Sequence, residues 1–250
     1  MSSGLYSTFA GLAARSRALE LVANNLANVN TTGYKAQRAF YQSFTAQLNR
    51  ARLSPLNRAI NNFGVLGGSV VDRSSGTLEP TGNDLDLALE GPGFFTIQTA
   101  AGVRYTRNGN FRMSPTGELV TEKGDRVLAR QEPGQPPAPI QIPNGQVSVS
   151  PDGTVSVQGA VVARLRLADF APEIMLTPEG NSYFVAPAGS EQPAADASVR
   201  QGTLEASNLN VVEGAVGLII LQRHAGILQR ALSLFHNEFN RIAVEDLPRI

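Results

Sequence analysis

Residues 5–35 have the sequence LYSTFAGLAARSRALELVANNLANVNTTGYK, and the predicted architecture is built outward from this segment. Its leucines recur every seven residues, at Leu5, Leu12, Leu19 and Leu26. A seven-residue spacing places side chains on one face of an α-helix, so the segment predicts an amphipathic helix of about eight turns. We expect this helix to stop within residues 28–33, where Asn and Thr side chains compete for backbone hydrogen bonds. Gly33 is the predicted C-cap, because glycine tolerates the left-handed conformation that closes many helices.

The C-terminal segment, residues 201–250, repeats the heptad pattern. Apolar side chains fill one heptad position at Val211, Leu218, Ala225, Leu232 and Phe239, and a second position at Leu221, Leu228, Phe235 and Ile242. A helix over this run would be a rod of roughly 45 to 50 Å at a rise of 1.5 Å per residue. One small domain could hardly cover an apolar seam of that length, so we expect the seam to pack against other helices.

The middle of the chain changes to a period of two. Apolar and polar residues alternate at 85–89, 95–97, 147–149, 155–157 and 163–167. Turn pairs such as Asn108-Gly109 separate these segments, which is typical of hairpins in an antiparallel sheet. The predicted fold class is therefore α+β, with long terminal helices of the coiled-coil type flanking a mainly antiparallel β domain. Its parts are a helical segment over 1–40, an extended linker over 41–80, the β-rich domain over 81–200, and a helical segment over 201–250 that pairs with the first.

Composition excludes several function classes. The 250 residues include 21 Lys and Arg against 21 Asp and Glu, so no net field exists to attract nucleic acid or an anionic membrane. The absence of Cys removes disulfides, thiolate nucleophiles and Cys-ligated metals. The N-terminus lacks the basic start and apolar run of a secretory signal, and we expect no later run long enough to span a bilayer. If the protein leaves the cytoplasm, another route must export it.

Charge is balanced in total but not along the chain. Residues 21–71 carry basic side chains and no acidic ones, namely Lys35, Arg38, Arg50, Arg52 and Arg58. Residues 172–213 carry six acidic side chains against Arg200 alone. Three arrangements fit this asymmetry: the two stretches neutralise each other inside one subunit, they face solvent, or they meet head to tail between subunits.

The titratable residues form no recognisable catalytic or metal site. His224 and His236 are twelve residues apart on the predicted last helix, about 18 Å along its axis, and cannot bind one metal ion. Asp84 and Asp86 alternate with leucines, so we expect both on the solvent face of a strand. The turn at 91–93 lacks the lysine of a phosphate loop, and no serine lies in a Gly-x-Ser-x-Gly motif. We predict no catalytic residue, no metal and no cofactor.

Amide side chains gather at the end of the first helix. Asparagine is a poor helix former, so helix propensity does not explain this composition. Two interpretations stay open: the amides end the helix by competing for backbone hydrogen bonds, or they face a neighbouring helix or subunit, where an amide donates and accepts at once. The residues predicted to take part in helix packing and assembly are Leu5, Leu12, Leu19, Asn24, Asn25, Leu26, Asn28, Gly33, Leu218, Leu221, Leu228, Leu232 and Phe235.

Four blocks of sequence, in order along the chain, resemble the bacterial flagellar axial proteins of the rod and hook. They are ANNLANVNTTGYK at 23–35, LDLALEGPGFF at 85–95, YTRNGNF at 105–111 and GTLEASNLNVV at 202–212. Within that family the chain is most similar to the proximal rod protein, with the distal rod or hook subunit as the alternative. After Leu228 the sequence departs from the family pattern.

The resemblance implies a structural subunit of the flagellar basal-body rod, the drive shaft in the periplasm, and not an enzyme. It implies export by the flagellar type III apparatus without a cleaved signal peptide. It also implies a homo- and hetero-polymer with other rod and hook subunits, assembled through the terminal helices, without nucleic acid or membrane insertion. A β-domain module that binds cell-wall glycan is a rival, although the chain has no Trp and 6% aromatic residues. An intracellular coiled-coil adaptor is another.

Overall fold

The computed structural model describes residues 2–43, 64–131, 135, 137–180 and 182–245. The chain forms two compact units, which we call the helical unit and the β unit. The helical unit comprises Met1–Leu26, Gln37–Val70 and Asn210–Ile250, and the β unit comprises Ala27–Ala36 and Val71–Leu209. The chain therefore passes between the two units at four points, after residues 26, 36, 70 and 209.

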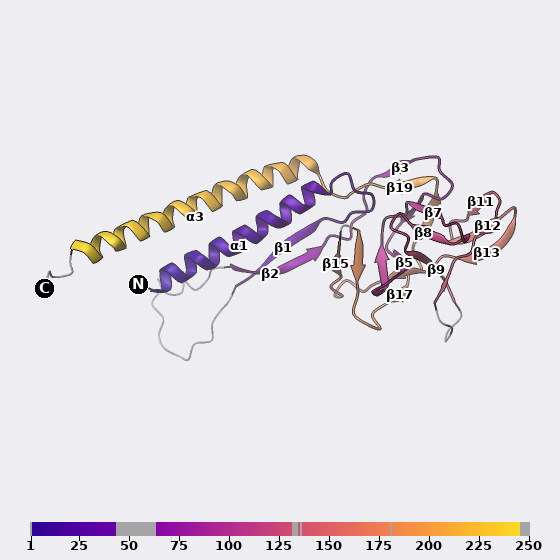
Figure 1. The fold of residues 1–250 in the computed structure, drawn as a ribbon, viewed down its shortest axis with the longest axis horizontal. Helices are drawn as coiled ribbons and strands as arrows, with labels where there is room; N and C mark the ends of the chain where they lie inside the picture. Colours follow the sequence, from indigo (N-terminus) through magenta and orange to yellow (C-terminus); the bar gives the residue numbers. More distant parts are fainter. Residues whose placement is uncertain (1, 44–63, 132–134, 136, 181, 246–250) are drawn as a thin grey trace. The chain divides into compact units, whose positions relative to one another are not determined.

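The helical unit contains both predicted terminal helices. They are α1 (Ser2–Ala27) and α3 (Val211–Glu245), each an unbroken rod in Figure 1. The unit also contains a two-stranded sheet of β1 (Gln37–Ser43) and β2 (Gly64–Val71). Strand β2 lies inside the segment expected to be a linker, and residues 44–63 of that segment lie outside the described residues.

Helix α1 ends at Ala27, six residues before Gly33, so the prediction that Gly33 caps the helix is wrong. The helix stops earlier because Asn28 and Thr31 form turn hydrogen bonds that replace the helical ones. The Thr31 N–H donates to the Asn28 carbonyl at 3.0 Å, and the Thr31 hydroxyl to Asn28 Oδ1 at 3.3 Å. Gly33 takes a φ of +65° in the loop that follows.

Helix α3 begins with a side-chain cap. Asn210 Oδ1 accepts hydrogen bonds from the N–H groups of Val212 at 3.0 Å and Glu213 at 3.3 Å. These N–H groups have no partner inside the helix, and asparagine is among the best residues for satisfying them. Glu213 adds a negative charge in the first turn, where the helix dipole favours it.

The β unit is built from antiparallel pairs, as predicted. Its ten-stranded sheet follows the order β15-β16-β6-β5-β9-β8-β7, and in addition β10 pairs with β9, β14 with β5, and β17 with β14. These strands are β5 (Phe94–Thr99), β6 (Gly102–Thr106), β7 (Phe111–Met113), β8 (Leu119–Thr121), β9 (Arg126–Ala129), β10 (Ala138–Pro139), β14 (Leu167–Asp169), β15 (Thr177–Glu179), β16 (Tyr183–Val185) and β17 (Gln192–Pro193).

Smaller sheets complete the β unit. Strands β11 (Val147–Val149), β12 (Thr154–Val157) and β13 (Ala160–Arg164) form a meander. Strand β4 (Leu87–Glu90) pairs with β18 (Ser198–Gln201), and β3 (Leu78–Pro80) pairs with β19 (Thr203–Glu205). The last two pairings join the start of the unit to its end, across more than 100 residues of sequence.

Two apolar clusters form the core of the β unit. The larger one includes Leu87, Leu89, Phe95 and Ile97, and the smaller one groups Phe94, Phe170 and other aromatic side chains. In β4, Leu87, Ala88 and Leu89 are all buried, so this strand lacks the predicted alternation. A strand that is buried on both faces is apolar along its length. The charged residues Asp86 and Glu90 lie just before and at the end of this buried run.

One expectation about the acidic side chains is wrong. Asp86 is buried, 6% exposed, although Asp84 is exposed as predicted. The Asp86 carboxylate accepts hydrogen bonds from Thr81 Oγ1 at 2.7 Å and Asn83 Nδ2 at 3.1 Å. Because a buried carboxylate needs such donors, Asp86 fixes the turn before β4 and does not lie on a solvent face.

Candidate assembly helices and a buried charge cluster

Helix α1 buries small side chains and leaves its leucines half-exposed. Ala14 and Ala18 are 6% and 2% exposed, and Asn25 on the same face is 5% exposed. Leu12, Leu19 and Leu26 are half-buried, and the side chain of Leu5 lies outside the description. At 3.6 residues per turn, the leucine stripe lies about 110° around the axis from the buried face. The predicted stripe is therefore only partly covered within one chain.

Asn25 and Asn28 act within the subunit. Asn25 Nδ2 donates to the Gln37 carbonyl at 2.8 Å, and Asn25 Oδ1 accepts from the Gln37 N–H at 3.0 Å. The amide thus pairs with the first residue of β1 as a neighbouring strand would. Asn28 is buried in the turn after α1, whereas Asn24 is exposed. Helix termination accounts for Asn28, while Asn25 joins α1 to β1.

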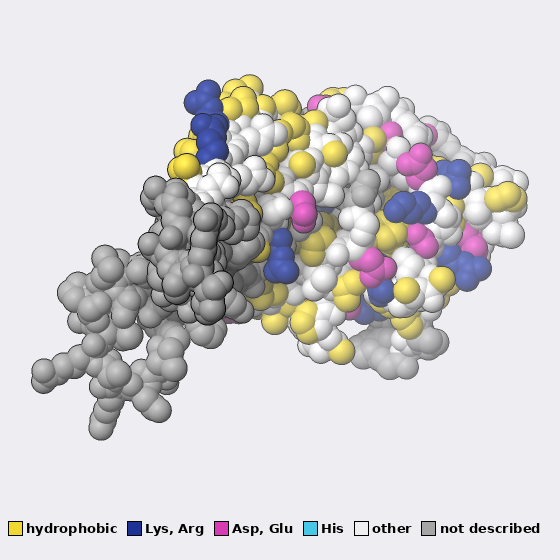
Figure 2. All heavy atoms as spheres, turned by 60° about the vertical axis from the view of Figure 1, so that its left-hand side comes forward, with side chains coloured by type: hydrophobic (Ala, Val, Ile, Leu, Met, Phe, Trp, Pro, Cys, Tyr) yellow, Lys and Arg dark blue, Asp and Glu magenta, His cyan; other side chains and the backbone are white. Residues whose placement is uncertain are grey.

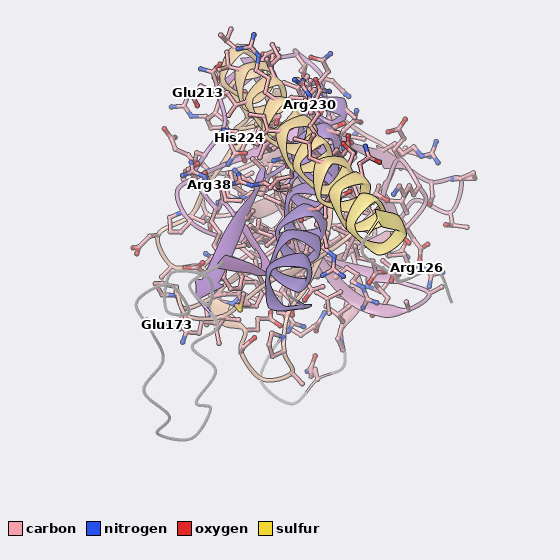
Figure 3. The ribbon with its side chains drawn as sticks, turned by 90° about the vertical axis from the view of Figure 1, so that its left-hand side faces the viewer. Arg38, Arg126, Glu173, Glu213, His224 and Arg230 are labelled. Atoms are coloured by element: carbon pink, nitrogen blue, oxygen red, sulfur yellow. The ribbon has the colours of Figure 1, made fainter. Side chains whose placement is uncertain are left out.

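Helix α3 is apolar on two opposite sides. Leu218, Leu221, Leu228 and Leu232 of the predicted seam are half-buried, and the side chain of Phe235 lies outside the description. The opposite side carries exposed apolar side chains, namely Val212, Val216, Ile219, Ile220, Ile227 and Leu234, which are 47% to 71% exposed. Arg223 and Arg230 share that second side, and Figure 3 labels Arg230, His224 and Glu213 along the helix.

The apolar length of α3 corrects the expectation that no run could span a bilayer. Val211–Leu234 is long and apolar enough by length and composition, and its most apolar window has a mean hydropathy of 1.4, although Arg223 and Arg230 interrupt the segment. Of its most apolar window, 6% is buried. Length and composition do not distinguish a membrane span from a helix that packs on other helices.

Three charged side chains from three of the motifs meet inside the β unit. Lys35 Nζ lies 2.6 Å from Glu205 Oε1, and an Arg107 terminal nitrogen lies 3.1 Å from Glu205 Oε2. Their side chains are between 0% and 2% exposed. Burial lowers the pKa of Lys35 and of Arg107, and the Glu205 carboxylate opposes both shifts. One carboxylate therefore compensates two buried cations.

Backbone groups complete this charge cluster. Lys35 Nζ donates to the Ser74 carbonyl at 2.5 Å, and Glu205 Oε1 accepts from the Gly76 N–H at 2.7 Å. Arg107 donates to the carbonyls of Leu89 at 3.1 Å and Gly91 at 2.6 Å. Buried charges need hydrogen bonds as well as countercharges, so these backbone partners stabilise the charged side chains in the interior.

Gly33 lies directly against the cluster. A Cβ atom there would stand 2.3 Å from the backbone of both Arg107 and Asn108, and the φ of +65° also disfavours any other residue. Its N–H donates to the Glu205 carbonyl oxygen at 2.7 Å. The sequence identified Gly33 but not this role. Sequence patterns did not point to Lys35, Arg107 and Glu205 as partners, although each is the one charged residue of its motif.

The cluster also bears on the uneven charge of the chain. Glu205 pairs with Lys35, and Glu191 and Glu179 pair with Arg166 and Arg104. Half of the acidic side chains of 172–213 are thus neutralised within one subunit. Figure 2 shows basic and acidic side chains interspersed on the visible face of the β unit. Arg50, Arg52 and Arg58 lie outside the described residues, so head-to-tail pairing through them stays a prediction.

Comparison with known proteins identifies relatives of this chain. A family model described as flagella basal body rod protein matches residues 5–35, and one described as the flagellar hook protein FlgE/F/G D1 domain matches residues 88–157. The chain is 35% identical to the flagellar basal-body rod protein FlgF of Caulobacter vibrioides, over 100% of both proteins. The chain belongs to the family of flagellar basal-body rod proteins. It is a structural subunit of the rod, and not an enzyme.

Other rod proteins align with this subunit over most of their length. FlgF of Rhizobium meliloti is 32% identical over 89% of each chain, and FlgG of Borreliella burgdorferi is 29% identical over 95% of this chain and 96% of its own. The rod model ends on Lys35, and the D1 model contains Arg107. The buried charge cluster therefore joins the two family segments.

Among the described residues, no three His, Asp or Glu side chains are grouped to hold a metal ion.

Proposed function

We propose that this rod subunit polymerises through α1 and α3, which pack as a coiled coil against each other and against the helices of neighbouring axial subunits. The observation that carries the proposal is the second apolar side of α3, which is 47% to 71% exposed over six residues in the single chain. Exposed apolar surface of this extent marks an interaction site. Packing residues would be the half-buried leucines of both helices with Asn24 and Phe235, and the exposed apolar side of α3 would face the neighbouring subunits, whereas Asn25, Asn28 and Gly33 make contacts within the subunit.

Cysteine accessibility tests this proposal, because the chain has no Cys of its own. Ile227→Cys, 59% exposed in the single chain, should react rapidly with a maleimide in purified monomer and become protected in isolated basal bodies. Asn144→Cys, in an exposed turn of the β unit, is the control that should react in both states. Equal reactivity of Ile227→Cys before and after assembly would contradict packing through this side of α3.

We propose export through the flagellar export apparatus, without a cleaved signal peptide, to a periplasmic position in the basal body. The basal-body relatives support this route. Mass spectrometry of the protein in isolated basal bodies should recover peptides from the first helix. Secretion that continues in a strain lacking the export apparatus would rule the route out.

We propose a proximal position in the rod, and contacts with both identical and different axial subunits. The stretch from residue 152 to residue 170 supports the proximal assignment. Relatives named FlgF and FlgG reach similar identities, 35% in each case at best among those compared, so the distal position is the alternative. Electron microscopy of basal bodies from a deletion strain decides between them. Loss of the distal segment alone would favour the alternative.

A further inference from the structure

The chain passes between its two units at four points, and the segments beside three of these passages contact one another within the β unit. They are residues 33–36, which precede the passage after residue 36, residues 72–76, which follow the passage after residue 70, and residues 205–208, which precede the passage after residue 209. We call these three segments the root. The passage at 26 leads into the root through the short loop 27–32.

Asn208 contacts both other segments of the root. Its Oδ1 accepts from the Ala36 N–H at 2.8 Å, and its Nδ2 donates to the carbonyls of Asp72 and Ser74 at 3.0 Å each. Its own N–H donates to the Tyr34 carbonyl at 3.4 Å. An asparagine side chain offers one amide acceptor and one amide donor group, and here each serves a different segment.

Glu205 and Lys35 supply a second set of connections. Glu205 accepts from the N–H groups of Gly33 and Gly76, at 2.7 Å in both cases, while Lys35 donates to Ser74. The Asp72 N–H donates to the Ala36 carbonyl at 2.8 Å. Each pair of segments is therefore joined at two or more points. Releasing one segment alone would break hydrogen bonds of Glu205 or Asn208 and leave polar groups without partners. This cost penalises the opening of a single segment.

We infer that the root opens and closes as one cooperative element, with Asn208 as the positioning residue that couples its three segments. In the rod, this element would keep the three root segments together while the subunit carries torque. That consequence rests on the proposed function. The cooperativity itself rests on the hydrogen bonds of the single chain.

Native-state hydrogen exchange on the full-length protein tests the inference. Four amides report on the root, namely those of Gly33, Ala36, Asp72 and Gly76. In wild type we expect them to share one opening free energy and one urea dependence, as members of a single cooperative unit do. Different urea dependences for Gly33 and Asp72 would overturn the inference.

A variant supplies the second arm. Asn208→Asp keeps the shape of the side chain and removes its donor, so all four amides should exchange at least about tenfold faster, including Gly33 and Gly76, which Asn208 does not touch. Asn144→Asp, at an exposed turn, should leave them unchanged. Acceleration confined to Ala36 and Asp72 would refute cooperativity.

The two arms separate this inference from the proposed function. If Asn208→Asp fails to fold, the wild-type urea series alone supports or overturns the inference. Because both arms use purified monomer, they do not depend on assembly. A subunit whose Ile227→Cys stays reactive in basal bodies would contradict the proposed polymerisation and leave the exchange result intact.

Discussion

Glu205 balances two buried cations, and this arrangement predicts an unequal response to substitution. Glu205→Gln removes the carboxylate that contacts both buried cations, Lys35 and Arg107, which should lower the free energy of unfolding by about 3 to 5 kcal/mol. Lys35→Met leaves Arg107 and Glu205 as a neutral pair, so the loss should be smaller, about 1 to 3 kcal/mol. Urea unfolding followed by far-ultraviolet circular dichroism measures both. A larger loss for Lys35→Met would contradict this account.

Gly33 allows a second prediction at a single position. Gly33→Ala should cost about 1 to 2 kcal/mol for the left-handed backbone and a further 1 to 3 kcal/mol for overlap with the backbone of Arg107 and Asn108. The control is Gly189→Ala, because Gly189 has a similar φ of +76° and nothing within 4 Å of a Cβ atom. Equal losses in urea unfolding would show that the close approach costs nothing.

Two tyrosines predict how stability depends on alkaline pH. Burial, with Glu191 beside Tyr105 and Asp125 beside Tyr183, raises the pKa of each phenol to about 12. An unfolded tyrosine ionises near pH 10, so the folded state holds the proton more tightly. The stabilisation is complete below about pH 10 and is lost as the pH rises from 10 to 12.

Urea midpoints measured between pH 9 and pH 11.5 check this prediction. Tyr105→Phe and Tyr183→Phe should each reduce the steepness of the decline, because each removes one proton difference between the folded and unfolded states. Tyrosinate absorbance of the folded protein should rise late for these two residues. A pH dependence unchanged by both substitutions would exclude them as the cause.

At the scale of the element, the two sides of α3 should respond differently. Ile227→Asn replaces an exposed apolar side chain, so the monomer should change by about 0.5 kcal/mol or less, while the number of flagella per cell falls. Gln229→Asn, an exposed polar neighbour, is the control and should leave flagella unchanged. Normal flagellation with Ile227→Asn would mean that this side of α3 faces no partner.

The two terminal helices show how much of an element the periodicity of its sequence predicts. The heptads predicted two terminal helices, and both are present, although α3 is apolar on two opposite sides. The heptads did not predict that α1 buries Ala14 and Ala18 in place of its leucines. Small residues allow close backbone approach without a strong apolar signal, so periodicity alone points to the larger side chains.

At the scale of the molecule, the two units should differ in protection before assembly. Helices draw most of their stability from packing, and no described side chain of α3 is fully buried in the single chain. Hydrogen exchange on the monomer should therefore show fast amides in α3 and slow amides in the core strands β5 and β9. Equal protection of α3 and the core strands would contradict assembly-dependent order.

The sequence by itself determined the terminal helices, the antiparallel β middle and the family, because heptads, alternation, turn pairs and ordered motifs are local signals. Only the tertiary structure decided how the motifs meet. Glu205 lies 170 residues from Lys35 and 98 from Arg107, and the pairing of β3 with β19 helps bring these regions together. Local periodicity carries no information about a partner at that separation, so the buried charges, the position of Gly33 and the links through Asn208 emerge only from the folded chain.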